Sequence, residues 1–192
     1  MTEQVEQEVI QKAMTGNTNA FRVIVDHYQS FAYAVSFRFL GQAEEAEDIV
    51  QEAFIRLWKN LHKYRSEVKL STWLYRIITN LCLDFLKSTY ARRQKNHSDV
   101  QTEYLLKSQN GADAELNARE LNEQIHQAAA ELTPKQKAVF ILRDLEGLPV
   151  EEVCSILSMS TGNVKSNLYY ARQQMSERLK KYFQITEKIT AP

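Results

Sequence analysis

The stretch that decides the fold is residues 132–172, which reads LTPKQKAVFILRDLEGLPVEEVCSILSMSTGNVKSNLYYAR. Its apolar residues recur at helical spacing and predict a short helix over 150–157. Ser158-Met159-Ser160 forms a turn, and a longer helix follows from Thr161 to about Met175. This order predicts a helix-turn-helix, the unit whose second helix lies in the major groove of DNA.

The helix before this unit has a well-marked start. Thr133 can cap it, Pro134 suits the first helical position, and Gln136 completes a capping box. Gly147 ends it, and its inner face is predicted to consist of Ala138, Val139, Ile141, Leu142 and Leu145.

The second helix of the unit has an apolar side and a polar side. Its inward positions are predicted to be Val164, Leu168, Ala171 and Met175. Thr161 and Gly162 open the helix, so their backbone amides lie where phosphate binds favourably. The outward positions carry side chains that suit base edges and phosphate, namely Asn163, Lys165, Ser166, Asn167, Tyr169, Tyr170, Arg172 and Gln173. An ordinary helical hairpin with a polar surface is the alternative, and the turn and anchors together favour DNA.

Helical spacing covers most of the remaining chain, which has only five Gly and three Pro, so we expect an all-α fold. Residues 94–113 lose the pattern and predict a flexible linker between two small helical bundles, 1–93 and 114–192, the second containing the helix-turn-helix. The first two N-terminal helices are expected from about Val5 to Thr15 and from a cap at Thr18 to Leu40. A third is expected from near Ala43, and a fourth begins after a cap at Ser71 or Thr72. The inward side chains of this fourth helix are predicted to be Leu74, Ile77, Ile78, Leu81 and Phe85.

Nothing in the sequence suggests secretion, membrane insertion or bound cofactors. The N-terminus is polar and acidic, and the chain has no run of about 18 apolar residues. Cys82 and Cys154 lie in apolar helical patterns, as reduced core residues of a cytoplasmic protein do. The four histidines are scattered and make no metal spacing with these cysteines. We therefore expect a non-enzymatic cytoplasmic protein without a metal, a cofactor or a catalytic group.

The formal net charge of zero hides alternating acidic and basic blocks. Residues 59–95 carry nine basic and two acidic side chains, whereas 1–58 and 96–134 are both acidic. Cations track phosphates and aromatic faces stack on unpaired bases, so the basic block predicts a single-stranded nucleic-acid site. Its members are Lys63, Arg65, Lys69, Arg76, Lys87, Arg92 and Arg93, with Tyr64, Trp73 and Tyr75. Taken singly, Trp73 and Tyr75 fit core positions better.

The helix expected from Ala43 carries acidic side chains at positions 44, 45, 47, 48 and 52. Such a face should not meet nucleic acid, but it can dock on a basic protein surface, where complementary charge sets orientation. From charge alone, a solvated helix face explains the acids equally well.

Four motifs follow one another along the chain: DIVQEAF over 48–54, TWLYRI over 72–77 with NLCLD over 80–84, LTP over 132–134, and GNVKS over 162–166. In this order and with these spacings, the chain resembles a bacterial RNA polymerase sigma factor of the two-domain extracytoplasmic-function (ECF) class. The resemblance covers nearly the whole chain. It implies a specificity factor that binds core RNA polymerase and directs transcription initiation at −10 and −35 promoter elements.

The resemblance also implies a role for each matching residue. Residues 1–93 would be sigma region 2 and residues 114–192 sigma region 4, and an anti-sigma factor is a further expected partner. The core-polymerase contacts would be Asp48, Gln51, Glu52 and Phe54. The −10 element, as a melted strand, would be bound by Lys63, Tyr64, Arg65, Lys69, Arg76 and Asn80. The −35 duplex would be bound by Thr161, Asn163, Lys165, Ser166, Asn167, Tyr170 and Arg172.

Some positions depart from the family pattern. Asn167 and Tyr170 stand where arginine is common in the family, so phosphate contact there should be weaker or the −35 preference altered. Ser158 stands where glycine is usual in the turn, and Cys154 stands where a small alanine is usual.

Two other functions stay open at this point. Residues 1–92 could form the sensing or dimerising domain of a one-component regulator that binds operator DNA without polymerase. A recombinase would need a nucleophile and clustered arginines in its first half, and this chain shows neither there. The charge blocks also leave open whether the two halves shield each other in the free protein.

Overall fold

The computed structural model describes residues 3–95, 125 and 127–190, and in these ranges the only regular elements are helices. The linker predicted over 94–113 lies almost wholly outside the described residues. The N-terminal half holds α1 (Glu3–Met14), α2 (Thr18–Leu40), α3 (Ala43–Asn60), the short helix η1 (Leu61–Lys63) and α4 (Leu70–Lys95). The C-terminal half holds α6 (Pro134–Phe140), the π-helical segment η2 (Ile141–Leu145), α7 (Val150–Leu157) and α8 (Thr161–Thr190).

The helices of the N-terminal half begin and end largely as the sequence predicts. Gly41 ends α2 in the left-handed conformation with φ 74°, which glycine adopts without strain. The cap of α2 is Asn17, whose side chain accepts from the Ala20 amide at 3.0 Å, so the prediction of a Thr18 cap is wrong by one residue. Helix α4 already begins at Leu70, before the predicted caps Ser71 and Thr72.

The predicted start of α6 is confirmed in detail. Thr133 Oγ1 accepts from the Gln136 amide at 3.4 Å, and Gln136 Oε1 accepts from the Thr133 amide at 3.0 Å. The turn 158–160 then joins α7 to α8 as a helix-turn-helix. Helix α8 continues to Thr190, far beyond the predicted end near Met175.

Two apolar side chains predicted to face inward are exposed. Phe85 is 38% exposed and Leu145 is 39% exposed. In a π-helix each turn takes more residues than in an α-helix, so Leu145 is rotated away from the face that buries Ile141 and Leu142. On α4, Leu81 and Cys82 occupy the inner face, and Phe85 lies at its edge.

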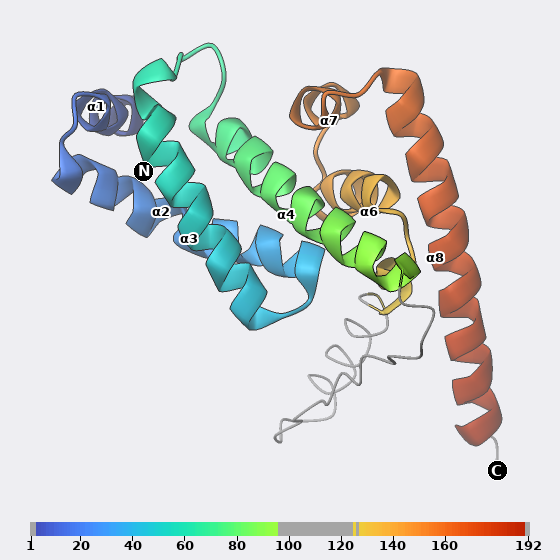
Figure 1. The fold of residues 1–192 in the computed structure, drawn as a ribbon. Helices are drawn as coiled ribbons and strands as arrows, with labels where there is room; N and C mark the ends of the chain where they lie inside the picture. Colours follow the sequence, from blue (N-terminus) through green and yellow to red (C-terminus); the bar gives the residue numbers. More distant parts are fainter. Residues whose placement is uncertain (1–2, 96–124, 126, 191–192) are drawn as a thin grey trace.

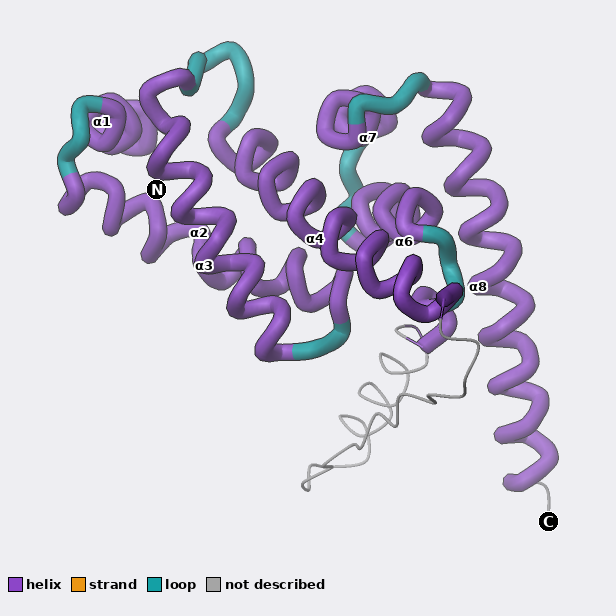
Figure 2. Tube along the Cα trace, viewed as in Figure 1, coloured by secondary structure: helices purple, strands orange, loops and turns teal. Residues whose placement is uncertain are grey.

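The two helical halves pack directly against each other in this structure. Helix α4 lies between the other N-terminal helices and the C-terminal half, and it contacts both α6 and α7 (Figure 1). A single apolar cluster runs from Ile10 and Phe39 through Leu74 and Ile78 to Val139 and Ile156. The tube view shows the same arrangement, with α8 along the outer edge (Figure 2). The all-α prediction is therefore confirmed, but the sequence did not predict this shared core.

The turn of the helix-turn-helix generates a first prediction. Ser158 has φ 52° and ψ 46°, and among the described residues it alone combines a side chain with positive φ. This conformation costs a side-chain-bearing residue about 1–2 kcal/mol. Ser158→Gly should therefore raise the free energy of unfolding by about 1 kcal/mol, measured by urea denaturation.

Ser155→Gly, inside α7, is the matched control. There glycine has no strain to relieve and should lower the free energy of unfolding by about 1 kcal/mol. If both substitutions destabilise the protein equally, the backbone at Ser158 is not strained.

Candidate nucleic-acid interface

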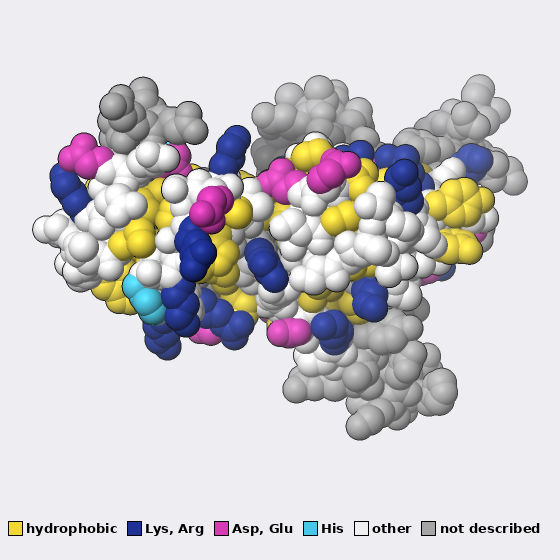
Figure 3. Space-filling model, turned by 90° about the horizontal axis from the view of Figure 1, so that it is seen from above, with side chains coloured by type: hydrophobic (Ala, Val, Ile, Leu, Met, Phe, Trp, Pro, Cys, Tyr) yellow, Lys and Arg dark blue, Asp and Glu magenta, His cyan; other side chains and the backbone are white. Residues whose placement is uncertain are grey.

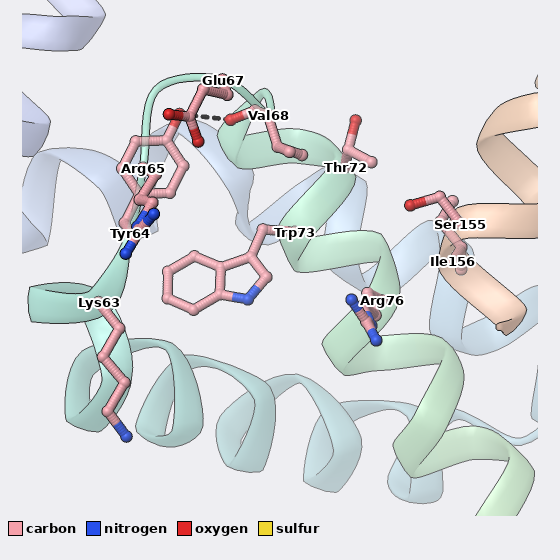
Figure 4. Close-up of a pocket in the computed structure, with 10 residues that line it drawn as sticks. All are labelled: Lys63, Tyr64, Arg65, Glu67, Val68, Thr72, Trp73, Arg76, Ser155 and Ile156. Atoms are coloured by element: carbon pink, nitrogen blue, oxygen red, sulfur yellow. Dashed lines mark hydrogen bonds between the residues drawn. The ribbon is translucent and has the colours of Figure 1, made fainter.

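A cavity of about 370 Å³ opens where the loop between η1 and α4 meets the first turns of α4. Trp73 points from α4 toward the loop, and Arg76 lies one turn further along the same helix (Figure 4). The far wall comes from α7. The residues that line the cavity are Lys63, Tyr64, Arg65, Glu67, Val68, Thr72, Trp73, Arg76, Ser155 and Ile156.

An aromatic pair builds the inner side of this cavity. The rings of Tyr64 and Trp73 are stacked, with centroids 5.6 Å apart and planes 26° apart. The Tyr64 hydroxyl donates to the Val68 carbonyl at 2.8 Å and so closes the loop on itself (Figure 4). Burial raises the pKa of Tyr64, with a smaller effect from Glu6, so the hydroxyl stays a donor at neutral pH. A stacked, half-buried pair of this kind offers a flat apolar edge to an unpaired base.

Four of the seven cations in the predicted basic block lie at this cavity or in its loop, whereas Lys87 lies farther along α4 and pairs with Asp84 at 3.5 Å. Lys63, Arg65 and Arg76 line it, and Lys69 is exposed in the same loop. Seen from above, Lys and Arg side chains gather around hydrophobic surface in the N-terminal part of this face (Figure 3). Asn80 is exposed on α4 one turn beyond Arg76 and does not line the cavity.

Tyr75 has a different place from its aromatic neighbours. It is 8% exposed and packs edge-on against Phe31, with ring centroids 4.6 Å apart. The prediction that Tyr75 taken singly is a core residue is confirmed. Its hydroxyl donates to Glu146 Oε2 at 2.7 Å, across the boundary between the halves.

Sequence reasoning missed several residues of this cavity. Ser155 and Ile156 reach it from α7, about 80 positions away along the chain from Thr72 and Trp73. Thr72 is predicted to be a possible helix cap and part of the TWLYRI motif, and in the structure its hydroxyl donates to Glu152 of α7 at 2.6 Å. No local pattern marks these contacts, because helical periodicity shows only that a face is apolar and not which helix covers it.

The apolar and polar sides of α8 agree with the predicted pattern. Val164, Leu168, Ala171 and Met175 are at most 9% exposed. The residues assigned to the −35 duplex are exposed, except that Asn167 is half-buried and donates to the Asn163 carbonyl at 2.8 Å. Ser160 Oγ accepts from the Asn163 amide at 3.3 Å and so caps the helix start.

Arg172 is engaged within the C-terminal half. Its guanidinium donates twice to Asp144, with N–O distances of 2.8 and 2.6 Å. The Asp144 carboxylate raises the pKa of Arg172 further. This fork holds α8 against η2, so Arg172 has a structural partner besides its predicted phosphate contact.

Tyr169 and Tyr170 replace charge with aromatic surface on α8. They are 65% and 52% exposed, and their rings meet edge-on with centroids 5.4 Å apart. Large exposed aromatic rings on a predicted DNA-facing helix can contact sugars and thymine methyl groups where an arginine would contact phosphate.

The acidic face of α3 is solvent-facing at its centre. Asp48 and Gln51 are exposed, and Glu52 is half-exposed and accepts from Arg56 Nε at 2.7 Å. Phe54 is only 7% exposed and belongs to the core. Its ring supports α3 from beneath in this structure, and contact of Phe54 with core polymerase stays a prediction.

The described parts of the chain contain neither a metal-binding cluster nor a membrane-spanning helix. No group of three or more His, Cys, Asp or Glu side chains there is placed to hold a metal ion. None of the helices in those parts combines the length and the apolar character that crossing a membrane requires. Both cysteines are free thiols, Cys82 buried and Cys154 half-buried.

Comparison with known proteins agrees with these surfaces. The family described as Sigma-70 region 2 matches residues 24–93, and the family Sigma-70, region 4 matches residues 122–175. The ECF RNA polymerase sigma factor SigW of Bacillus subtilis (strain 168) is 34% identical over 177 residues, which are 89% of this chain and 95% of SigW. The ECF sigma-E factor of Escherichia coli (strain K12) is 26% identical, over 93% of this chain and 97% of that protein.

Solved structures share the fold. CnrH in complex with the cytosolic domain of CnrY gives a TM-score of 0.63 at 20% identity, covering 92% of this chain and 97% of CnrH. The sigma factor RpoE in complex with the anti-sigma factor NepR from Bartonella quintana gives 0.62 at 21% identity, covering 83% and 96%. The similarity to SigW includes the N-terminal half, which the one-component alternative assigned to sensing or dimerisation.

The Arg172–Asp144 fork generates the second prediction. Asp144→Asn keeps the shape of the side chain but removes its charge, and it should lower the free energy of unfolding by about 1 kcal/mol. Urea denaturation measures the change, and Glu177→Gln on the exposed side of α8 is the charge-matched control. Equal stability of Asp144→Asn and the control would show that the fork does not hold α8 on η2.

Proposed function

The chain belongs to the ECF class of RNA polymerase sigma factors, and we propose that three chemically distinct surfaces divide its work. The acidic face of α3 docks on core polymerase. The basic, aromatic-lined cavity before α4 holds the melted −10 strand, and the exposed side of α8 lies in the −35 duplex. This assignment is supported above all by the separation of the three surfaces. The acidic surface lies on α3, the basic and aromatic one before and along α4, and the polar one on α8.

The docking role rests on Asp48, Gln51 and Glu52. Their side chains project from α3 at helical spacing while Phe54 and Ile49 anchor the opposite side in the core. An anchored acidic helix presents its carboxylates in a fixed array, which suits a basic helical surface on the polymerase. We assign Phe54 to positioning this helix.

The −10 role rests on the cavity. The aromatic edge of Tyr64 and Trp73 accommodates an unstacked base, and Lys63, Arg65 and Lys69 neutralise the phosphates of the strand that carries it. Arg76 and Asn80 extend this surface along α4. Holding unpaired bases on one strand stabilises the melted promoter relative to the duplex.

The −35 role rests on the first three turns of α8. Thr161, Asn163, Lys165 and Ser166 are exposed at the start of the helix, where backbone amides favour phosphate. Asn167, Tyr170 and Arg172 follow on the next turns. Because Asn167 and Tyr170 stand where relatives commonly carry arginine, fewer phosphate contacts and more base or methyl contacts are expected here.

The remaining assignments complete the proposal. Residues 1–93 act as region 2 and residues 114–192 as region 4, with 94–113 as the linker that lets one chain span both promoter elements. The protein works in the cytoplasm, performs no reaction itself and needs no cofactor. An anti-sigma factor is the expected regulatory partner, as NepR is for RpoE in the complex from B. quintana.

The whole proposal is tested by transcription with purified bacterial core RNA polymerase on a promoter library. The protein should bind core and direct initiation from a subset of sequences that share two spaced elements. Failure to bind core, or initiation at no promoter, would refute it.

The third prediction concerns α3. Asp48→Lys reverses one exposed charge at the centre of the acidic face, so affinity for core polymerase should fall by about tenfold or more. The binding of duplex −35 DNA by the same variant should stay unchanged. Glu8→Lys on α1 is the matched control, because Glu8 is also exposed and its reversal should leave core affinity intact. Equal core affinity of the two variants would contradict the docking role.

The fourth prediction concerns α8. Lys165→Ala should lower the slope of log affinity against log salt concentration by about one unit, with little change in sequence preference, if Lys165 contacts phosphate. Lys180→Ala on the same helix is the control and should leave the slope unchanged. A changed −35 preference without a changed slope would assign Lys165 to base contact instead.

A further inference from the structure

The residues of α4 that join the two halves include Arg76, which is predicted to bind the −10 strand, and its neighbours Thr72 and Tyr75. Thr72 of α4 donates to Glu152 of α7 at 2.6 Å, and Tyr75 donates to Glu146 at 2.7 Å. Arg76 lies 3.5 Å from the Ser158 hydroxyl at the turn of the helix-turn-helix. Three successive polar positions of α4 are thus engaged by the C-terminal half.

Glu146 is the centre of this contact. Its side chain is only 8% exposed, and its two carboxylate oxygens accept from different helices. Oε1 accepts from Arg38 of α2, and Oε2 accepts from Tyr75 of α4. Burial and the Glu146 carboxylate both raise the pKa of Tyr75, so its hydroxyl remains a donor at all physiological pH values. A buried carboxylate is retained only where such donors satisfy it.

The same closure puts α7 over the cavity. Ser155 and Ile156 face Thr72 and Arg76 across it (Figure 4), and Ile156 is only 1% exposed. A nucleic-acid strand lying along Thr72 and Arg76 would occupy the space that α7 fills. The acidic face of α3 and the DNA-facing side of α8 remain exposed in the same state.

We propose that Glu146, Arg38 and Tyr75 form a latch that holds the free protein closed, with α7 as a lid over the strand-binding cavity. The melted strand enters only after the C-terminal half has left α4. Initial contact of α3 with core polymerase does not require this opening. The latch stands on the contacts above, and the identity of the excluded strand rests on the proposed function.

Cys82 of α4 provides a natural reporter of the closed interface. Its side chain is fully buried, and α4 packs against α6 and α7 of the C-terminal half. Burial raises the pKa of the Cys82 thiol to about 12, against smaller lowering effects of Lys137 and Ser36. Separation of α4 from the C-terminal half should therefore make this thiol more accessible to reagents.

The latch is tested on the full chain by breaking it from either side. Glu146→Gln removes the charge that Arg38 and Tyr75 share, and Arg38→Met removes the cation from the other half. Glu131→Gln is the matched control, because it breaks the Arg178–Glu131 pair inside the C-terminal half and changes the net charge as Glu146→Gln does. Spin labels at Asp26→Cys and Gln174→Cys, in a Cys82→Ala, Cys154→Ser background, report the distance between the halves by pulsed electron resonance.

Both latch variants should shift the distance distribution to longer values, and the control should match the parent protein. A native readout is the rate at which Cys82 reacts with a thiol reagent in a Cys154→Ser background, which should rise about tenfold in both latch variants. Unchanged distances and unchanged Cys82 reactivity in both variants would overturn the latch.

The lid is tested by binding a fluorescein-labelled single-stranded DNA oligonucleotide of mixed sequence. Affinity should rise about tenfold in Glu146→Gln and also in Arg38→Met, which loses a positive charge, but not in Glu131→Gln. If the latch variants open yet bind the strand no better than the parent protein, the lid is overturned. If no variant binds it at all, the −10 assignment fails while the distance measurement still decides the latch.

Discussion

The buried carboxylate of Glu146 is the interaction on which the arrangement of the two halves depends. Water would satisfy this group completely in an open molecule, so its burial is tolerated only because Arg38 and Tyr75 together use both of its oxygens. The donors come from two helices of the N-terminal half, which fixes the angle as well as the distance of approach. The apolar contacts of α4 with α6 and α7 complete the same interface.

Local chemistry made much of the fold predictable. The capping box at Thr133 and Gln136, the glycine ends of helices, and the inward spacing of Val164 and Leu168 all depend on residues within a few positions of each other. Such signals can be read from one sequence. The π-helical turn that exposes Leu145 could not be read, because an added residue per turn leaves no mark in composition.

The candidate site likewise has a part that depends on neighbouring residues and a part that depends on long-range packing. The loop from Lys63 to Lys69 and the polar side of α8 were predictable from charge and spacing, since each lies in one short segment. The wall contributed by Ser155 and Ile156 was not, because it depends on how two helices far apart in the chain meet. Phe54 shows a third case, because it lies inside the motif DIVQEAF, which is predicted to bind core polymerase, and yet it is buried in the core.

The continuous apolar cluster has a consequence for how this protein can be tuned. The buried cluster shared by the two halves includes aliphatic side chains such as Val139, Leu142 and Leu74, none of which belongs to the residues proposed to bind DNA. The residues that would set the fraction of open molecules therefore differ from the residues that would set the promoter preference. A substitution that adds or removes one methyl group in that cluster would change the fraction of open molecules. The order of affinities for different promoters would stay the same.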